Sequence, residues 1–134
     1  MNYWLVKSEP FKYSWQQFEE DGRTFWDGVR NFQARNSLKA MNLDDQVLFY
    51  HSNEDRAIVG IAQVVKTAYQ DPSTEDPNWV VVDLVPLEKL AKPVTLAQIK
   101  ADARLENNAL VKQSRLSVMP ISLEAFEIIV GLGF

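Results

Sequence analysis

The chain has 134 residues, of which 46% are hydrophobic and 24% are charged, and its 14 basic and 18 acidic side chains give a net charge of −4. This length fits one domain of ordinary size, ~100–200 residues, and the composition excludes a disordered tail and a membrane-spanning protein. No cysteine is present, which excludes a disulfide scaffold, a thiolate nucleophile and any zinc site that uses sulfur. We therefore expect a single domain over residues 1–134.

Strand patterns rich in β-branched and aromatic residues occur at five places, which are Tyr3–Val6, Gln46–His51, Ala57–Thr67, Trp79–Pro86 and Arg115–Met119. Gly60, inside the third run, predicts a bulge or the close approach of another group. The fourth run is almost uninterrupted Val and Leu, so we expect it to be central in a sheet. Asp83 within it then needs a polar partner or an outward orientation.

Four helices are predicted between these strands. The first starts at Ser14-Trp15-Gln16-Gln17, which has the form of a capping box; it should bury Trp15 and Phe18 and end at Gly22. The others are predicted over Asn31–Met41, Thr95–Ala103 and Ser122–Val130.

In the second of these helices we expect Phe32, Leu38 and Met41 to face inward, with Arg35 and Lys39 together on a different face.

The turn-rich stretch 71–78 is predicted to be a surface loop. Strands interspersed with short helices predict the α+β class, with a curved, barrel-like sheet and short helices at its ends.

Motifs for catalysis, metal binding and phosphate binding are scarce. His51 is the only histidine, so it is the base of any Ser/His/Asp mechanism, but neither Ser8 nor Ser52 lies in a nucleophile elbow. The five glycines form no Walker or dinucleotide fingerprint, and the acidic residues lack metal-ligand spacing. We expect no metal, no cofactor and no catalytic residues.

The distribution of charge predicts a local basic face, and the targeting signals predict where the protein is located. Basic residues outnumber acidic ones in residues 1–39 and 99–120, whereas residues 40–98 are acidic. The N-terminal residues lack the basic and apolar segments of a signal peptide, and no apolar run is long enough to span a membrane. We expect no membrane partner and a cytoplasmic location, or a nuclear one if the source is eukaryotic.

The segment Phe25–Asn36 concentrates aromatic, cationic and amide side chains between two predicted helices. The indole of Trp26 offers a face on which a nucleobase could stack, and neighbouring polar groups could read the edge of that base. The alternative is that Trp26 anchors the core and that Asp27-Gly28 forms a turn. Composition alone favours this second interpretation, because aromatic side chains are more often buried than used as ligand platforms.

Several motifs along the whole chain closely resemble those of the EVE domain proteins, including the group related to thymocyte nuclear protein. The motifs are YWLVKSEP at 3–10, WDGVRNFQARN at 26–36, YHS at 50–52, IVGI at 58–61, Tyr69 and Asp71-Pro72, Trp79-Val80 and Val82-Asp83, PVTL at 93–96 with Ile99-Lys100, and QSRLSV at 113–118 with Pro120. The resemblance implies a PUA-like fold, related to the YTH and ASCH domains. It also implies a non-catalytic reader that flips a modified base of DNA or RNA, of the methylated cytosine or methylated adenine class, into an aromatic pocket.

The resemblance assigns the pocket to four segments of the chain. Trp26 is expected to be the stacking wall, and the other residues expected to contact the base are Ser8, Pro10, Asp27, Val29, Asn31, His51, Ser52, Leu116 and Ser117. The residues expected to contact phosphates are Lys7, Lys12, Arg30, Arg35, Lys39, Lys112 and Arg115. For Arg30 and Arg35, internal pairing with Asp27, Glu9 or Asp83 is the alternative.

Two other classes of function stay open at this point. The first is an enzyme that acts on a modified nucleotide or RNA, with His51 or Asp27 as acid or base. The second is a protein-interaction adaptor, which would need an exposed apolar patch.

Overall fold

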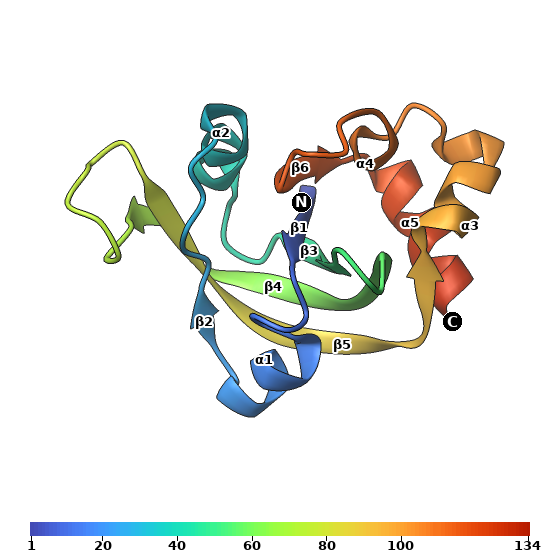
Figure 1. The fold of residues 1–134 in the computed structure, drawn as a ribbon, viewed down its shortest axis with the longest axis horizontal. Coiled ribbons are helices and arrows are strands. Elements are labelled where there is room, and N and C mark those ends of the chain that lie inside the picture. The colour runs from blue at the N-terminus through green and yellow to red at the C-terminus, as the bar shows by residue number, and fades with distance from the viewer.

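In the computed structural model, which describes residues 1–134, six strands form one mixed sheet in the order β2-β5-β4-β3-β1-β6. The strands are β1 (Tyr3–Ser8), β2 (Thr24–Phe25), β3 (Gln46–His51), β4 (Ala57–Gln70), β5 (Val80–Thr95) and β6 (Val118–Ile121). β1 runs parallel to β3, and every other neighbouring pair is antiparallel. Figure 1 shows how the long strands β4 and β5 bend along the sheet.

The α+β class is confirmed, but the sheet does not close into a barrel. β2 and β6 occupy opposite edges and do not pair with each other. The β4–β5 ladder contains four register shifts, and such irregularities bend and twist a strand pair. The sheet is therefore curved and open. Its two edge strands, which have two and four residues, do not reach each other to close it.

Short helices surround this sheet: α1 (Trp15–Asp21), α2 (Phe32–Ala40), α3 (Leu96–Ala101), the 3-10 turn η1 (Ala103–Leu105), α4 (Ala109–Lys112) and α5 (Leu123–Gly133). The capping role predicted for Ser14 is confirmed, because its side chain accepts a backbone N–H in the first turn of α1. The side chains of Thr95 and Ser122 do the same at α3 and α5. A complete capping box forms only at Thr95, with Gln98; at α1 only Ser14 takes part. Gly22 ends α1 in the left-handed conformation, as expected.

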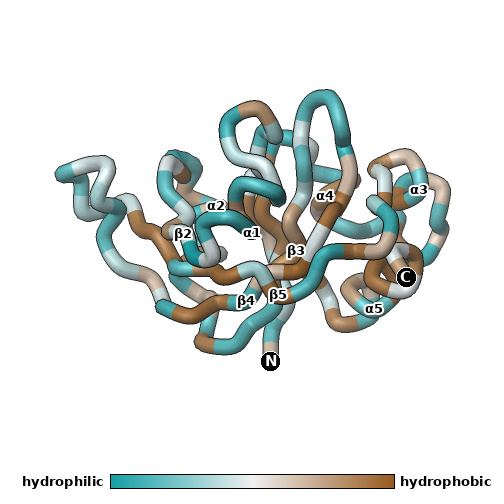
Figure 2. The backbone as a smooth tube through the Cα atoms, turned by 90° about the horizontal axis from the view of Figure 1, so that it is seen from below, coloured by the Kyte–Doolittle hydropathy of each residue, from teal (hydrophilic) through white to brown (hydrophobic).

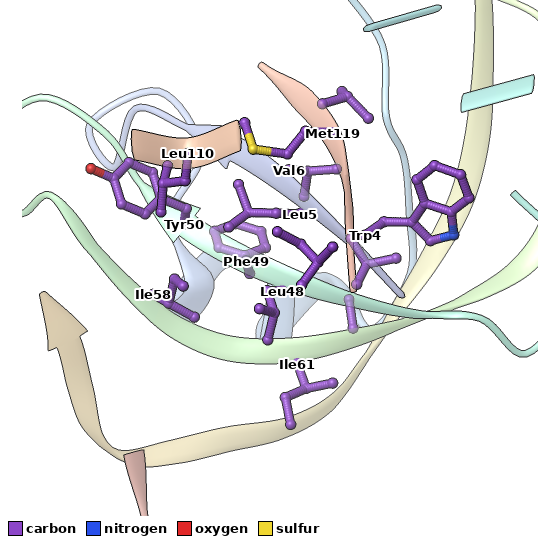
Figure 3. Packing of buried hydrophobic residues seen from close by; sticks show 14 of the residues in the cluster. Trp4, Leu5, Val6, Leu48, Phe49, Tyr50, Ile58, Ile61, Leu110 and Met119 are labelled. Carbon is purple, nitrogen blue, oxygen red and sulfur yellow. The ribbon is translucent and has the colours of Figure 1, made fainter. Parts of the chain in front are cut away.

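One hydrophobic cluster of 33 buried residues lies between the sheet and the helices. Figure 2 shows hydrophobic residues along β3, β4 and β5 and hydrophilic residues in the connecting loops. Figure 3 shows Leu5 of β1 and Phe49 of β3 at the centre of this packing. Phe49 also stacks on Phe18 of α1, with ring centroids 5.5 Å apart, so α1 is fixed against the sheet.

Gly60 combines both predicted properties. The pairing register shifts beside it, and a Cβ placed on it would lie 2.5 Å from a ring carbon of Trp15. Trp15 and Phe18 are buried, as predicted. Asp83 is also buried, and it has the polar partners that its position requires: Arg23 and Tyr69 both donate to its carboxylate.

Some predicted boundaries are wrong. β5 does not end at Pro86 but continues to Thr95, since the register shift beside Pro86 lets the strand pass a residue that lacks an N–H donor. β6 begins three residues later than the predicted start at Arg115. Phe32 does not face inward: it is the first residue of α2 and is exposed, with its ring stacked on Trp79 at 5.1 Å.

Candidate nucleic-acid interface

A hollow of about 400 Å³ opens where β1 ends and where the chain leaves β2. We call it the Trp26 hollow, and its lining residues are Lys7, Ser8, Glu9, Lys12, Tyr13, Thr24, Phe25, Trp26 and Asp27. Its size falls within the range of small-ligand pockets, ~300–1,000 Å³. Aromatic side chains and charged side chains of both signs therefore surround one cavity.

Trp26 is both a core residue and a wall of this hollow. Its side chain is only 8% exposed, and its ring packs edge-on against Tyr13 at 6.3 Å and against Phe49 at 5.4 Å. Its backbone N–H donates to the carbonyl of Val82, which fixes it to β5. Trp26 is thus a core anchor, as one interpretation of the sequence predicted, and its rigidly held ring also lines the cavity in which a base could stack.

The polar groups of the Trp26 hollow are partly engaged with each other. The Ser8 hydroxyl donates to the carbonyl of Tyr13 at 2.6 Å, which leaves its oxygen lone pairs able to accept. Glu9 pairs with Lys12 at 3.2 Å, and the hydrogen bond from Lys12 lowers the pKa of that carboxyl. Asp27 is exposed at the edge of the hollow. The hollow therefore offers acceptors from Ser8 and Asp27.

A buried carboxylate holds the segment that carries Trp26 and Asp27. Asp71 is fully buried and accepts hydrogen bonds from the N–H of Gly28, from Arg30 and from both the N–H and the hydroxyl of Ser73. Burial alone would raise its pKa, but these hydrogen bonds outweigh it and lower the pKa to about 2. Gly28 has φ +77°, a conformation that favours glycine. The loop 71–78 is on the surface as predicted, yet its first residue is an internal anchor.

His51 lies outside the Trp26 hollow. Its Nε2 accepts the backbone N–H of Trp15 at 3.0 Å, so Nδ1 carries the proton and donates to Asp55 at 2.9 Å. Its ring also packs edge-on against Phe49. With both nitrogens occupied, this side chain holds the start of α1.

A second hollow of about 330 Å³ adjoins the first one and shares Lys7 with it. We call it the Lys100 hollow, and its lining residues are Lys7, Tyr50, Ser52, Asn53, Arg56, Leu96, Lys100, Leu110 and Ser114. The ammonium of Lys7 donates to the carbonyl of Ser114 at 2.8 Å and lies 5.7 Å from the centre of the Tyr50 ring. Burial lowers the pKa of Lys7.

A third, more open hollow of about 390 Å³ shares Ser114 with the second one. We call it the Arg115 hollow, and its lining residues are Asn31, Gln33, Lys112, Gln113, Ser114, Arg115 and Leu116. No carboxylate lines either the Lys100 hollow or the Arg115 hollow. The three hollows thus follow one another through Lys7 and Ser114.

The residues expected at the site are distributed over all three hollows. Ser8, Trp26, Asp27, Lys7 and Lys12 line the Trp26 hollow, and Ser52 lines the Lys100 hollow. Asn31, Leu116, Lys112 and Arg115 line the Arg115 hollow. The residues that line none of the three are Pro10, Val29, His51, Ser117, Arg30, Arg35 and Lys39.

The two arginines of the 26–36 segment have internal partners other than those considered from the sequence. Arg30 pairs with Asp71 at 3.0 Å and lies over the Trp79 ring. Arg35 bonds the side chain of Asn36 and lies over the Phe32 ring at 4.8 Å. Neither pairs with Asp27, Glu9 or Asp83.

Sequence reasoning missed several residues of these hollows, among them Tyr13, Phe25, Arg56 and Lys100. Phe25 could have been found, because it begins the aromatic and cationic segment that the sequence singled out. Arg56 and Lys100 lie far apart in the chain, and only the pairing of β4 with β5 brings Ala57 opposite Thr95 and so joins them.

Two negative findings complete the description. No group of three or more His, Cys, Asp or Glu side chains is arranged to hold a metal ion. None of the helices has the length and apolar character that crossing a membrane requires.

Comparison with known proteins gives matches over nearly the whole chain. The sequence profile of the EVE domain family matches residues 2–132. Thymocyte nuclear protein 1 of Mus musculus is 37% identical over 98% of this chain and 73% of its own length. The protein of the same name from Homo sapiens is 33% identical over 98% of this chain and 73% of its own length.

Solved structures agree with these matches. A protein from Agrobacterium tumefaciens superposes with a TM-score of 0.97 at 41% identity, covering 99% of this chain and 93% of that one. Human THYN1, crystallised in complex with 5-methylcytosine-containing DNA, superposes with a TM-score of 0.93 at 32% identity, covering 99% and 98%. An ASCH protein from Zymomonas mobilis shares the fold at 12% identity, with a TM-score of 0.63.

Proposed function

The chain belongs to the EVE domain family, and from this membership we propose that it is a binding module for DNA that contains a methylated cytosine. The single observation that carries the proposal is the match, along nearly the whole of both chains, to human THYN1 in complex with 5-methylcytosine-containing DNA. The proposed partner is nucleic acid, and no cofactor is required. We further propose a cytoplasmic location, or a nuclear one in a eukaryotic source, in keeping with the word "nuclear" in the names of the vertebrate relatives.

The Trp26 hollow is the proposed seat of the flipped base. A base that leaves the duplex loses its stacking and pairing, at a cost of a few kcal/mol. The Trp26 ring would replace the stacking, which is worth ~1–3 kcal/mol per base. Because Tyr13 and Phe49 hold the indole edge-on, little side-chain entropy is lost when a base arrives. The oxygens of Ser8 and Asp27 are the proposed acceptors for the amino group of cytosine.

Recognition of the methyl group by burial alone would give modest discrimination. One buried methyl contributes ~0.8 kcal/mol, which corresponds to a severalfold preference for the methylated base. Phe25 lines the hollow and is 45% exposed, so it is the proposed apolar contact for that methyl group. The apolar residues expected to contact the base, Val29, Pro10 and Leu116, do not line this hollow.

Four basic side chains of the three hollows are the proposed contacts to the DNA backbone. Lys7 and Lys12 line the Trp26 hollow, and Lys112 and Arg115 line the Arg115 hollow. Neutralising phosphates releases counterions, so the affinity should fall as the salt concentration rises. Arg30 is no longer proposed as a phosphate contact, because its guanidinium neutralises the buried Asp71.

We propose binding rather than catalysis because the side chain best suited to proton transfer is otherwise engaged. An acid or base must reach the substrate, but both ring nitrogens of His51 are hydrogen-bonded within the protein. Asp27 is accessible, yet the other carboxylate of its hollow, that of Glu9, is paired with Lys12.

The proposal is tested by titrating labelled oligonucleotides that carry one 5-methylcytosine or one cytosine, as single-stranded DNA, duplex DNA and RNA. We expect the wild type to prefer the methylated DNA severalfold. Trp26→Leu should weaken that binding about 5- to 100-fold, from the lost stacking energy. Trp4→Leu is the matched control, because Trp4 is also a buried indole but lines none of the hollows. Both variants are first checked for cooperative unfolding.

Equal affinity for methylated and unmethylated DNA would contradict the reader function. Tighter binding of the RNA would contradict the assignment to DNA. Equal losses in Trp26→Leu and Trp4→Leu would show that the indole acts on stability and not on the base.

A further inference from the structure

We propose that the Lys100 hollow is a phosphate site, which receives the backbone of the bound strand within two linkages of the flipped base. The inference rests on the proposed function, because it assumes a base in the Trp26 hollow. It assigns a role to Arg56 and Lys100, neither of which the sequence predicted as a phosphate contact.

The charge of this hollow is unusual for the protein as a whole. The chain carries more acidic than basic side chains, 18 against 14, yet three cations and no carboxylate line this cavity. The three come from separate elements: Lys7 from β1, Arg56 from the β3–β4 hairpin and Lys100 from α3. Like charges repel when they are brought together, so a cluster of this kind is suited to an anion that lies between them.

The acidic residue next to Arg56 in the hairpin is not free to neutralise this cluster of cations. Asp55 directly precedes Arg56, but its carboxylate accepts the hydrogen bond from Nδ1 of His51. This hydrogen bond thus directs the negative charge of Asp55 towards His51. The hydroxyl and amide groups of Ser52 and Asn53 then supply neutral hydrogen-bonding groups to the hollow.

Two of the three cations, Arg56 and Lys7, are held in place before any ligand binds. Arg56 has φ +45°, a backbone conformation that residues other than glycine rarely adopt. Its carbonyl accepts the N–H of Leu96 at 2.8 Å. Its Nε donates to the carbonyl of Asn53 at 3.0 Å, so the remaining guanidinium N–H groups are available. Lys7 is fixed by the carbonyl of Ser114. Groups ordered in advance lose less entropy on binding.

The lining favours a phosphate over a second nucleobase. Stacking a base requires an accessible aromatic face. The only aromatic ring here is that of Tyr50, and the Lys7 ammonium already lies over its face, 5.7 Å from the ring centre. Since Lys7 lines both hollows, a strand whose base occupies the Trp26 hollow would pass its backbone over Lys7 into the Lys100 hollow.

The test combines charge variants with oligonucleotides in which one phosphate at a time is replaced by a neutral methylphosphonate. Single-stranded DNA with one 5-methylcytosine is used, with the neutral linkage at each of three positions on either side. The double variant is Arg56→Gln with Lys100→Gln. The matched control is Lys89→Gln with Lys92→Gln, which also removes two positive charges but from exposed positions on β5 outside all three hollows.

In the wild type, one neutral linkage within two positions of the methylated cytosine should weaken binding about tenfold. In the double variant that linkage should cost nothing further, while the control keeps the full wild-type pattern. The slope of log affinity against log salt should also fall by about 0.7 in the double variant, the value for one phosphate on a single strand.

An unchanged pattern of linkage costs in the double variant would overturn the phosphate site, as would an equal change in the control. This outcome is separable from failure of the proposed function. If the wild type binds methylated and unmethylated strands equally but the linkage pattern still depends on Arg56 and Lys100, the phosphate site stands and the base reader falls. If the wild type binds no oligonucleotide, both are overturned.

Discussion

The carboxylate of Asp71 accepts the backbone N–H of Gly28 at 3.0 Å, across 43 residues of sequence. Asp71 begins the β4–β5 loop, and Gly28 lies in the segment that leaves the Trp26 hollow. This hydrogen bond and the ion pair between Arg30 and Asp71 join the segment after the Trp26 hollow to the loop that follows β4. The position of one wall of the hollow thus depends on a residue that does not line it.

Replacing Asp71 by Asn should destabilise the fold by about 1–3 kcal/mol, because a buried donor loses a charged acceptor. Urea unfolding measures this change. Asp76→Asn, an exposed change in the same loop, is the control and should have little effect. A stability loss confined to Asp76→Asn would contradict the anchoring role of Asp71.

The stability of the protein should depend on Asp71 at acidic pH. Its pKa is about 2 in the folded state against an ordinary value of 3.8, so the folded state favours the charged form. The resulting stabilisation is fully present above about pH 4 and is lost as the pH falls towards 2; the shift corresponds to about 2 kcal/mol. Unfolding free energies measured from pH 5 to pH 2 should fall more steeply in the wild type than in Asp71→Asn. Parallel curves would contradict the assignment.

Tyr69 should titrate well above a normal tyrosine. Burial and the hydrogen bond to Asp83 raise its pKa to about 12, because ionisation would place two negative charges together. Its contribution to stability is complete below about pH 10 and is lost as the pH rises towards 12. Absorbance titration of the wild type minus Tyr69→Phe isolates this residue. A difference curve centred near pH 10 would show that the Asp83 contact does not persist in solution.

Gly60→Ala should destabilise the protein by about 1–3 kcal/mol, because its Cβ would lie 2.5 Å from the Trp15 ring inside the core. Gly131→Ala is the matched control: nothing lies within 4 Å of its Cβ, and it is in helix α5. There the change should stabilise by about 0.5–1 kcal/mol through helix propensity. Thermal unfolding of both variants gives the comparison, and equal effects would contradict the close approach at Gly60.

His51→Ala should lower stability by about 1–2 kcal/mol while leaving DNA affinity per folded molecule unchanged. The substitution removes the acceptor for the N–H of Trp15 at the start of α1. Asp55→Ala is a useful comparison, since its side chain is about half exposed and its loss should cost less. A loss of affinity in stably folded His51→Ala would return this residue to the binding site.

Local sequence signals predicted much of the fold but not the connections between distant segments. The cap at Ser14 and the strand Gln46–His51 depend on neighbouring residues, and the structure confirms both. The two-residue strand β2 has no pattern of its own and exists only because it pairs with β5. The barrel-like form of the predicted sheet is not confirmed, because sheet curvature does not by itself bring the edge strands together.

For the candidate site, the sequence indicated Trp26 and the end of β1, which the structure brings into one hollow. The assignment of Trp26 to base binding stays a prediction. The sequence could not show that Arg30 is held by Asp71, because no local pattern links residues 41 positions apart. Nor could it show that Asp55 is directed towards His51, which leaves Arg56 and Lys100 in a hollow without a carboxylate.

The parallel pairing of β1 with β3 also has a consequence for the order of folding. β1 comprises residues 3–8 but is an interior strand, with β3 on one side and β6, residues 118–121, on the other. During synthesis β1 must therefore wait for more than a hundred further residues before both its edges are covered. Contacts so distant in sequence slow folding, because a long loop must close before they form. A nascent chain of this protein would thus expose an unpaired edge of β1 until β6 emerges, and it is at this stage that the protein is most open to aggregation.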